Sequence, residues 1–274
     1  MTVIKRQYVV IGKQVANSLS PKIHQAFARQ FNLPINYGYL EVQAQDFNSQ
    51  LQTFIKHGGK GANITAPFKS LICAQIAEFS LYAQQAKAVN TITIRADGTL
   101  FGDNTDGIGF LRDISLRHAM PIKNQRIIIL GAGGAVRGII QAIFSLSPRS
   151  VTLVNRDLTK AQKLVNDLAI TQMVQIIPYA ALANLEFDII INATSAWCDN
   201  KVPEISDNLN FVDKYCYDLN YQPQAQAFLK FAQHRGAKQV ANGLGMLVEQ
   251  AAEAFYIWHR LLPDAAAVYA QLQA

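Results

Sequence analysis

Long hydrophobic runs, cysteine pairs and clusters of basic residues are all absent from this sequence of 274 residues. No stretch of about 18 apolar residues occurs, and residues 1–14 lack the longer apolar core of a signal peptide. The three cysteines, Cys73, Cys198 and Cys216, form no Cys-x-x-Cys pair and have no histidine at metal-ligand spacing. We therefore expect a soluble, cytoplasmic protein without membrane contact, structural disulfides or a metal site.

The positive charge of the chain is not gathered into one binding surface. The formal net charge is +6, but lysine and arginine residues are scattered singly and form no stripe or basic run. On this ground we expect no nucleic-acid partner. A small anionic ligand explains the excess more simply, and so does chance.

Segments with a strand pattern alternate with segments of helical pattern along the first hundred residues. Strands alternating with helices of about 10–15 residues indicate βαβ units and a mainly parallel sheet. Ser20 and Asp46 are predicted as the N-caps of the first two helices. The predicted strands are 8–12, 35–42 and 61–65, followed by a hairpin around Asp97-Gly98.

The same alternation starts again after residue 107, and we place a domain boundary there. The segments 126–146 and 150–168 each combine an apolar strand with a helix. The segment 245–262 has a helical period of apolar residues, which Pro263 ends. The fold class is α/β, and a chain of 274 residues, half of them hydrophobic, suffices for two domains of about 100–150 residues.

A glycine-rich turn follows the first strand of the second half. Gly131, Gly133 and Gly134 lie between the apolar strand 127–130 and a helical pattern. In this context the backbone can approach a pyrophosphate at the helix N-terminus, which is typical of a Rossmann-type domain. Val136 stands at the sixth position of the Gly-x-Gly-x-x-Gly/Ala pattern, where a smaller residue is usual. A tight turn that binds nothing is the alternative explanation of the glycines.

The residues after the strand of the segment 150–168 indicate whether the cofactor is NAD or NADP. An NAD site places Asp or Glu there for the ribose 2′-hydroxyl, whereas this chain has Asn155, Arg156 and, one turn later, Lys160. A guanidinium can bind a 2′-phosphate bidentately and a carboxylate repels it, so the sequence favours NADP over NAD. Asp157 weakens this preference if it points inward, and a solvated charge is the alternative explanation of Arg156.

Polar side chains of the first half lie at or after the ends of predicted strands. Parallel α/β sheets bind ligands outside the carboxyl ends of their strands. Hydroxyls, amides, one ammonium and one carboxylate gathered there suit a polyhydroxylated acid. Each residue also has a structural explanation, as a helix cap, a turn, a surface lysine or an amide that satisfies backbone groups. The residues concerned are Ser18, Ser20, Asn63, Thr65, Lys69, Asn90 and Asp106.

Nine motifs are spread along the chain: "NSLSPKIHQAF", "GANITAPFK", "KAVNTI", "GDNTDGIGF", "GAGGAVRG", "NRDLTKA", "INATS", "YDLNYQP" and "NGLGMLVEQA". In their order and approximate spacing the chain resembles the shikimate dehydrogenase family over nearly its whole length. The resemblance implies NADPH-dependent reduction of 3-dehydroshikimate to shikimate in aromatic amino-acid biosynthesis. It also implies a substrate domain of residues 1–106 completed by 243–274, a Rossmann-type NADP-binding domain of residues 107–242, and an active site in the cleft.

The resemblance also implies a role for individual residues. The catalytic pair is Lys69 and Asp106, a lysine held by an aspartate that stabilises and protonates the developing alkoxide. The substrate-binding residues are Ser18, Ser20 and Tyr221 on the carboxylate and Asn63, Thr65, Asn90 and Gln250 elsewhere. The cofactor-binding residues are Gly131, Ala132, Gly133, Gly134, Ala135, Asn155, Arg156, Lys160, Thr194, Gly243 and Met246.

The chain departs from the family's pattern at three places. Asn242 stands where Asp is usual, Ala196-Trp197 where Ser-Gly is typical, and Thr-Pro is missing before Phe228. Altered cofactor affinity or a related substrate therefore stays open. The alternatives are a dehydrogenase with dual quinate and shikimate specificity, and a non-catalytic NADP-binding regulator. The double-serine site argues against a methylene-tetrahydrofolate dehydrogenase, and the oligomeric state stays open between monomer and homodimer.

Overall fold

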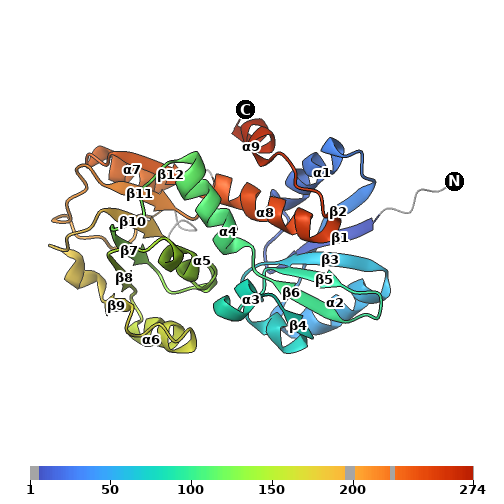
Figure 1. Cartoon of the computed structure of the whole chain (residues 1–274). Coiled ribbons are helices and arrows are strands. Elements are labelled where there is room, and N and C mark those ends of the chain that lie inside the picture. Colours follow the sequence, from blue (N-terminus) through green and yellow to red (C-terminus); the bar gives the residue numbers. More distant parts are fainter. Residues whose placement is uncertain (1–5, 195–200, 223–225, 274) are drawn as a thin grey trace. The chain divides into compact units, whose positions relative to one another are not determined.

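The computed structural model describes residues 6–194, 201–222 and 226–273 (Figure 1). The chain forms two compact units, the first made of Met1–Gly109 with Leu247–Ala274 and the second of Phe110–Met246. The departure at Ala196-Trp197 lies outside the described residues. Within the described ranges, no helix combines the length and the apolar character that a bilayer crossing requires.

The first unit is built on a mixed sheet with the strand order β2-β1-β3-β5-β6-β4. β1 runs parallel to β2 and β3, whereas β5 pairs antiparallel with β3 and β6, which confirms the hairpin predicted around Asp97-Gly98. The strands are β1 (Arg6–Gly12), β2 (Ile35–Glu41), β3 (Gly59–Ile64), β4 (Glu78–Phe79), β5 (Thr91–Ile94) and β6 (Leu100–Asp103). The helices are α1 (Ser20–Gln30), α2 (Phe47–Lys56), α3 (Leu81–Ala86) and α9 (Ala265–Gln273), with the beginning of α4 (Asp106–Leu111) and most of α8 (Leu244–His259).

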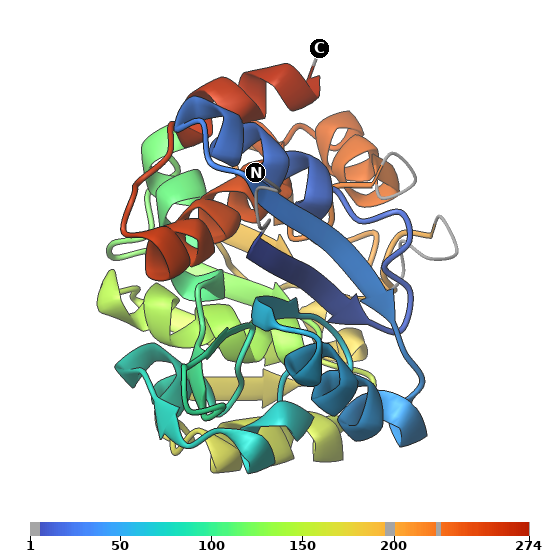
Figure 2. The same cartoon turned by 90° about the vertical axis from the view of Figure 1, so that its right-hand side faces the viewer.

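Two apolar cores hold this unit together. In one, Ile11 of β1 is buried with Phe47 of α2. In the other, Phe27 of α1 is buried with Phe255 of α8. Figure 2 shows α1 lying beside β1 and β2, with the C-terminal helices next to it. The last helices of the chain therefore belong to the first unit, because their apolar residues are buried against α1.

The predicted N-cap of the first helix is wrong. Leu19 occupies that position, and Ser20 is the first helical residue, followed by Pro21. The hydroxyl of Ser18 accepts a hydrogen bond of 3.2 Å from the backbone N–H of Ser20. Ser18 therefore satisfies the first backbone N–H of α1, and the Ser20 side chain is available for other contacts.

The C-terminal end of the chain also differs from the prediction. The helix predicted over 245–262 begins one residue earlier and ends at His259, and Arg260 has a φ of 57°. The helix α9, which begins after Asp264, was not predicted from the sequence. The carboxylate of Asp264 accepts a hydrogen bond of 3.0 Å from the backbone of Ala267. An acidic residue before an alanine-rich segment is an N-terminal signal, and it identifies this helix in retrospect.

The second unit is built on a parallel sheet with the strand order β12-β11-β10-β7-β8-β9. The chain changes direction across the sheet between β7 and β10, and sheets of this kind bind ligands at that switch point. The Rossmann-type fold is confirmed. The strands are β7 (Arg126–Leu130), β8 (Ser150–Val154), β9 (Val174–Ile177), β10 (Ile189–Asn192), β11 (Tyr215–Asp218) and β12 (Gln239–Asn242), and the helices are α5 (Gly134–Ser145), α6 (Leu158–Asp167) and α7 (Ala227–His234).

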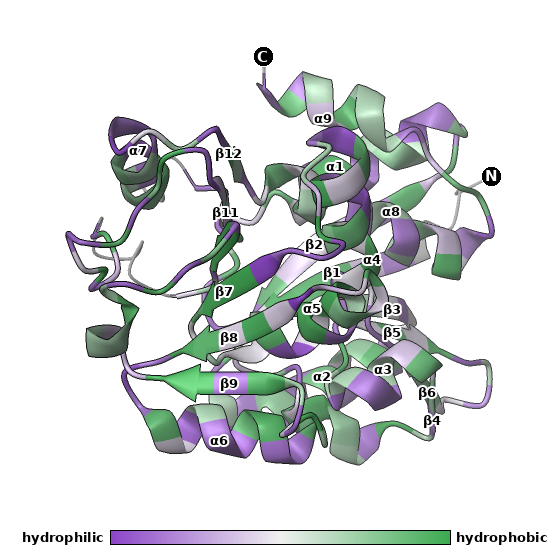
Figure 3. Cartoon of the chain, turned by 60° about the vertical axis from the view of Figure 1, so that its left-hand side comes forward, coloured by the Kyte–Doolittle hydropathy of each residue, from purple (hydrophilic) through white to green (hydrophobic). Residues whose placement is uncertain are grey.

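Helices cover both faces of this sheet. Ile129 of β7 is buried with Val136 of α5, and on the other face Ile128 is buried with Phe228 of α7. Figure 3 shows β7 and β8 as mostly hydrophobic, whereas hydrophilic and hydrophobic residues alternate along α6. Val136 is fully buried, so the core accommodates the larger residue at the sixth position of the glycine motif.

A buried carboxylate fixes the N-terminal end of α8 within the second unit. Asp113 is 0% exposed; its Oδ2 accepts a 2.5 Å hydrogen bond from the Tyr217 hydroxyl and its Oδ1 a 3.1 Å bond from Arg117 Nε. The backbone N–H of Met246 also donates to it. Burial raises the pKa of Asp113, and these hydrogen bonds oppose the shift. A Cβ on Gly245 would lie 1.8 Å from Asp113 Oδ1, so only glycine fits there.

A buried histidine lies in the aromatic core of the first unit. His24 of α1 is 0% exposed and stacks on Tyr37, with ring centroids 4.2 Å apart. Burial and, to a lesser extent, the nearby His259 lower the pKa of His24 to about 3, although its interaction with Asn63 opposes them. His24 is therefore neutral throughout the physiological pH range.

Replacing Gly245 by alanine tests the packing around Asp113. We expect the free energy of unfolding to fall by roughly 2–3 kcal/mol, because the new methyl group displaces the buried Asp113 carboxylate from its hydrogen bonds. The control is Gly134→Ala, since a Cβ at Gly134 meets nothing within 4 Å. Urea unfolding of both variants measures the difference. A Gly245→Ala protein as stable as the control would contradict this account.

The buried His24 predicts a pH dependence of stability. Its pKa is lower in the folded protein than the ordinary value of 6.5, so the unfolded chain binds a proton that the folded one excludes. The free energy of unfolding is therefore highest above pH 6.5. It falls below that pH by up to about 1.4 kcal/mol per pH unit, because the unfolded chain gains a proton on His24 that the folded protein does not bind. Urea unfolding between pH 7.5 and 5 should show a flatter slope for His24→Leu than for wild type. The exposed His57→Leu control should keep the wild-type slope, and equal slopes in all three proteins would contradict the prediction.

Candidate active site

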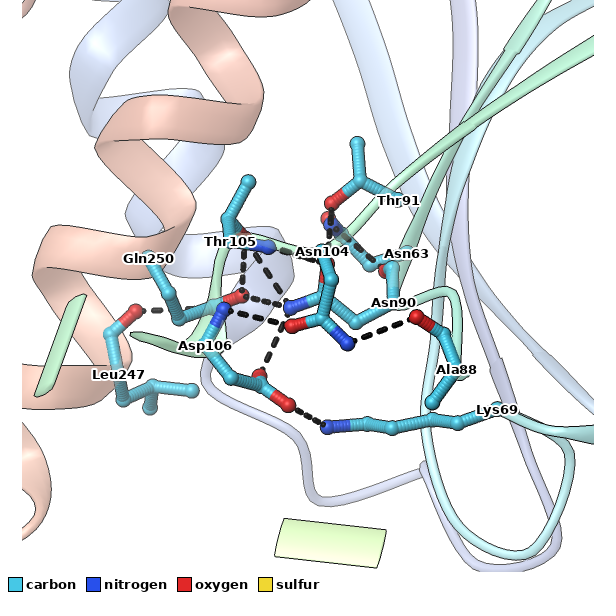
Figure 4. Close-up of polar contacts among 10 residues, drawn as sticks. All are labelled: Asn63, Lys69, Ala88, Asn90, Thr91, Asn104, Thr105, Asp106, Leu247 and Gln250. Atoms are coloured by element: carbon cyan, nitrogen blue, oxygen red, sulfur yellow. Dashed lines mark hydrogen bonds and ion pairs between the residues drawn. The ribbon is translucent and has the colours of Figure 1, made fainter. Parts of the chain in front are cut away.

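A lysine and an aspartate form an ion pair in the first unit (Figure 4). Lys69 Nζ lies 2.5 Å from Asp106 Oδ2, and the exposed fractions of the two side chains are 17% and 7%. Lys69 follows β3, and Asp106 is the first residue of α4, where its negative charge suits the helix N-terminus. The two residues are far apart in the chain, and the fold brings them together.

The side chain of Asn90 holds this pair in place. Its Nδ2 donates to Asp106 Oδ1 at 2.7 Å, and its Oδ1 accepts from the backbone N–H of Thr105 at 2.9 Å. The Asp106 backbone N–H donates to Asn104 Oδ1 at 3.1 Å. Asn90 is only 3% exposed, so these groups are satisfied by one another and not by water. The carboxylate of Asp106 is therefore fixed on one oxygen by Asn90 and on the other by Lys69.

Gln250 of α8 joins the same network. Its Oε1 accepts from Thr105 Oγ1 at 3.3 Å and from Asn90 Nδ2 at 3.4 Å, and its Nε2 donates to the Leu247 carbonyl at 2.9 Å. Figure 4 shows Gln250 reaching from its helix toward Asn90 and Thr105. The structure thus brings four of the predicted residues together: Lys69, Asn90, Asp106 and Gln250.

The two predicted serines lie close to each other. Ser18 Oγ donates to Ser20 Oγ at 3.1 Å, and Ser20 is 5% exposed. The hydroxyl of Tyr37 hydrogen-bonds Ser20 and donates to Asn63 Oδ1 at 2.6 Å. Burial raises the pKa of Tyr37 well above its ordinary value, and the bond to Ser20 opposes this shift.

A chain of hydrogen bonds connects the serines with the ion pair. Asn63 Nδ2 donates to Thr91 Oγ1 at 3.1 Å, and Thr91 Oγ1 donates to Asn90 Oδ1 at 2.9 Å. Thr65, which directly follows β3, is half-buried, and its backbone N–H donates to the Ile11 carbonyl at 3.0 Å. Hydroxyl groups at one end and an ammonium–carboxylate pair at the other suit a small hydroxylated acid.

The glycine turn of the second unit has room for a ligand. Gly131 has a φ of 104°, and a Cβ there would lie 2.9 Å from the Ala193 carbonyl oxygen, so packing alone requires this glycine. A Cβ on Gly133 or Gly134 would meet nothing within 4 Å, and neither residue has a positive φ. These two glycines leave open space at the N-terminus of α5, where backbone N–H groups and the helix dipole favour a phosphate group. The residues present therefore fit a dinucleotide.

A pocket of about 430 Å³ opens beside this turn. Most of the predicted cofactor residues line it: Gly131, Ala132, Gly133, Asn155, Arg156, Lys160 and Thr194. Gly134 and Ala135 lie in the first turn of α5. The remaining lining residues were not predicted from the sequence; they are Tyr179, Ala193, Lys201, Val202, Pro203 and Glu204. No local motif identifies them as cofactor-binding residues. They lie in the segments that follow β9 and β10, and only the fold brings these segments to the glycine turn.

Asp157, which would weaken the preference for NADP if it pointed inward, is bound to the backbone of α6. Its carboxylate accepts a hydrogen bond of 3.0 Å from the backbone N–H of Lys160 and caps α6. Arg156 is 77% exposed, and its Nη1 lies 4.0 Å from Glu204 Oε1. The arginine that the sequence assigns to a 2′-phosphate therefore lies at the pocket with its guanidinium open to solvent.

The last three predicted residues lie elsewhere in the second unit. A Cβ on Gly243 would lie 2.2 Å from the Leu219 carbonyl oxygen, so this glycine is required by the packing of its own unit. Met246 is buried in the core of that unit. Tyr221 follows β11 and is half-buried, and burial raises the pKa of its phenol.

Three family models match successive parts of the chain. Residues 10–92 match the shikimate dehydrogenase substrate binding domain, and residues 114–199 match the shikimate / quinate 5-dehydrogenase model. Residues 243–273 match the shikimate 5′-dehydrogenase C-terminal domain. The three matches together extend over most of the chain.

Solved structures similar to this chain include an Ael1 enzyme from Pseudomonas putida, at 40% identity, with 98% of each chain covered and a TM-score of 0.87. The shikimate dehydrogenase of Aquifex aeolicus is 30% identical, with 100% of each chain covered and a TM-score of 0.88. The shikimate 5-dehydrogenase of Thermus thermophilus, in complex with NADP(H) and shikimate, is 29% identical, with 98% of each chain covered and a TM-score of 0.86. The chain therefore belongs to the shikimate dehydrogenase family.

Proposed function

We propose that this protein catalyses the reversible reduction of 3-dehydroshikimate to shikimate with NADPH, in the biosynthesis of aromatic amino acids. The Lys69–Asp106 pair, 2.5 Å apart, is the observation that carries the proposal. A protein that only bound NADP would not need an ammonium and a carboxylate fixed by a buried network. The proposal includes a cytoplasmic location, because the reductant and the lack of a cysteine framework fit a reducing compartment.

Lys69 is the proton donor of this reaction. Bound NADPH supplies the hydride that reduces the ketone carbon. The ammonium of Lys69 donates a hydrogen bond to the carbonyl oxygen, stabilises the negative charge that develops there and transfers its proton to that oxygen. Asp106 accepts a hydrogen bond from Lys69 and so orients the ammonium, while Asn90 keeps the carboxylate from turning. In the reverse direction Lys69 takes the proton from the hydroxyl group.

The substrate is held by the hydrogen-bonding groups around this pair. The carboxylate of shikimate binds the hydroxyls of Ser18 and Ser20. The ring hydroxyls bind Thr65, Asn90 and Gln250. Asn63 supports them, because it connects Tyr37 with Thr91 and Asn90.

The second unit holds the cofactor. The N-terminus of α5, opened by Gly133 and Gly134, receives the pyrophosphate. Arg156 and Lys160 bind the 2′-phosphate, and Thr194 lies at the pocket with its hydroxyl donating to Asn192 Oδ1 at 2.8 Å. Gly243 and Met246, at the start of α8, would contact the nicotinamide, which supplies the hydride.

The direct test follows the loss of NADPH absorbance with purified protein and 3-dehydroshikimate. NADH and 3-dehydroquinate are run in parallel. Turnover with NADPH and 3-dehydroshikimate supports the proposal. Equal turnover of 3-dehydroquinate would replace it with a dual quinate and shikimate activity, and no turnover with any pair would overturn it.

Replacing Lys69 by methionine should lower kcat by about 10²–10⁴-fold, because the proton donor is lost while the apolar stem is kept. The control is Lys56→Met, an exposed lysine at the end of α2. Steady-state kinetics with NADPH and 3-dehydroshikimate measures both. A Lys69→Met enzyme with wild-type kcat would disprove the role given to this residue.

Replacing Arg156 by glutamine should weaken NADP⁺ binding by about tenfold and change NAD⁺ binding by less than twofold, because only NADP⁺ carries the 2′-phosphate. Isothermal titration calorimetry gives both dissociation constants. The control is Arg149→Gln, an exposed arginine that precedes β8, whereas Arg156 follows it. Equal losses for the two cofactors would show that Arg156 does not read the 2′-phosphate.

A further inference from the structure

A carboxylate lies among the positive charges of the cofactor pocket. Arg156, Lys160 and Lys201 line this pocket, and Glu204 lines it with them. A 2′-phosphate carries two negative charges at neutral pH, so lysine and arginine there are expected and a glutamate is not. No motif of the sequence points to Glu204.

Glu204 faces the guanidinium of Arg156. Its Oε1 lies 4.0 Å from Arg156 Nη1, and the exposed fractions of the two side chains are 71% and 77%. Tyr179 lies close to both. The pKa of its phenol is raised to about 12, chiefly by burial; Arg156 opposes this shift and Glu204 adds to it, so both charges act on the same residue of the pocket wall.

The other carboxylate nearby is already used. Asp157 follows Arg156 directly, but its side chain accepts the backbone N–H of Lys160 at 3.0 Å as the cap of α6. Among the residues that the structure describes, Glu204 is therefore the one whose carboxylate pairs with Arg156.

We propose that Glu204 sets the preference between NADP and NAD by competing with the 2′-phosphate for Arg156. This inference rests on the proposed function, because it assumes that the pocket binds a nicotinamide dinucleotide. To reach Arg156, a 2′-phosphate must displace the carboxylate and remain near a like charge, which weakens NADP binding. The 2′-hydroxyl of NAD carries no charge and can donate a hydrogen bond to Glu204. The wild-type protein therefore prefers NADP over NAD less strongly than it would if Arg156, Lys160 and Lys201 lined the pocket without Glu204.

The variant Glu204→Gln tests the proposal by binding alone. Calorimetry at constant ionic strength with 2′,5′-ADP and 5′-AMP isolates the 2′-phosphate, and NADP⁺ and NAD⁺ extend the comparison to whole cofactors. We expect 2′,5′-ADP and NADP⁺ to bind about threefold to tenfold more tightly to the variant, while 5′-AMP and NAD⁺ bind equally or more weakly. The control is Glu186→Gln, a comparably exposed glutamate that pairs with Arg126 at 3.2 Å and does not line the pocket.

Unchanged or weaker binding of 2′,5′-ADP to Glu204→Gln would overturn the proposal, as would the same gain for 5′-AMP. The double variant with Arg156→Gln identifies the cause. If Glu204 competes for Arg156, most of the gain disappears when the arginine is absent, and an undiminished gain overturns competition. Failure of the proposed function gives a different result, since Arg156→Gln then leaves 2′,5′-ADP binding unchanged whatever residue stands at 204.

Discussion

The buried side chain of Asn90 is the constraint on which the active site depends. A primary amide that is 3% exposed must find partners for both its oxygen and its nitrogen, since an unsatisfied amide in the protein interior is costly. The oxygen accepts from Thr105 N and Thr91 Oγ1, and the nitrogen donates to Asp106 Oδ1. The amide is fully satisfied only when β5, the start of α4 and the residues before it are all in place. The geometry of the Lys69–Asp106 pair is therefore a consequence of folding and needs no ligand.

Buried carboxylates have the corresponding role in the second unit. Asp218, at the end of β11, accepts from Asn192 and Asn220, and burial raises its pKa to about 6. Asn192 in turn accepts the backbone N–H of Thr194 at 3.1 Å, which fixes one wall of the cofactor pocket. Asp113 fixes the start of α8 in the same way. In contrast, the residues proposed to choose between cofactors, Arg156 and Glu204, are mostly exposed. Buried groups thus hold the geometry of the Lys69–Asp106 pair, whereas the two charges proposed to choose between cofactors lie at the surface, where a substitution leaves the core undisturbed.

Local sequence was sufficient for most elements and for many of the residues that line the sites. Apolar runs identified β1–β3, β7 and β8, a turn signal identified the β5–β6 hairpin, and helical periods identified α1, α2, α5, α6 and α8, whereas β4, β9–β12, α3, α4 and α7 were not predicted. The errors arose where neighbouring side chains decided the outcome. The hydroxyl of Ser18 accepts a hydrogen bond from the backbone N–H of Ser20. The helix therefore begins at Ser20, one residue earlier than a cap at Ser20 would allow. Asp264 accepts a backbone hydrogen bond from the first turn of α9. This helix was not predicted, because Pro263 was taken as the end of the helical segment.

The sequence by itself determined the α/β class, the family and the residue types of both sites, because periodicity and short motifs are written in consecutive residues. Only the tertiary structure decided which side chains meet across long separations. Asp113 and Tyr217 are 104 residues apart and Asn90 and Gln250 are 160 apart, and no local pattern records such pairs. The same holds for Glu204, an ordinary surface glutamate in the sequence, which becomes notable because the fold places it 4.0 Å from Arg156. Burial and long-range electrostatics arise from the packing of the whole unit, and they determine how each of these residues behaves.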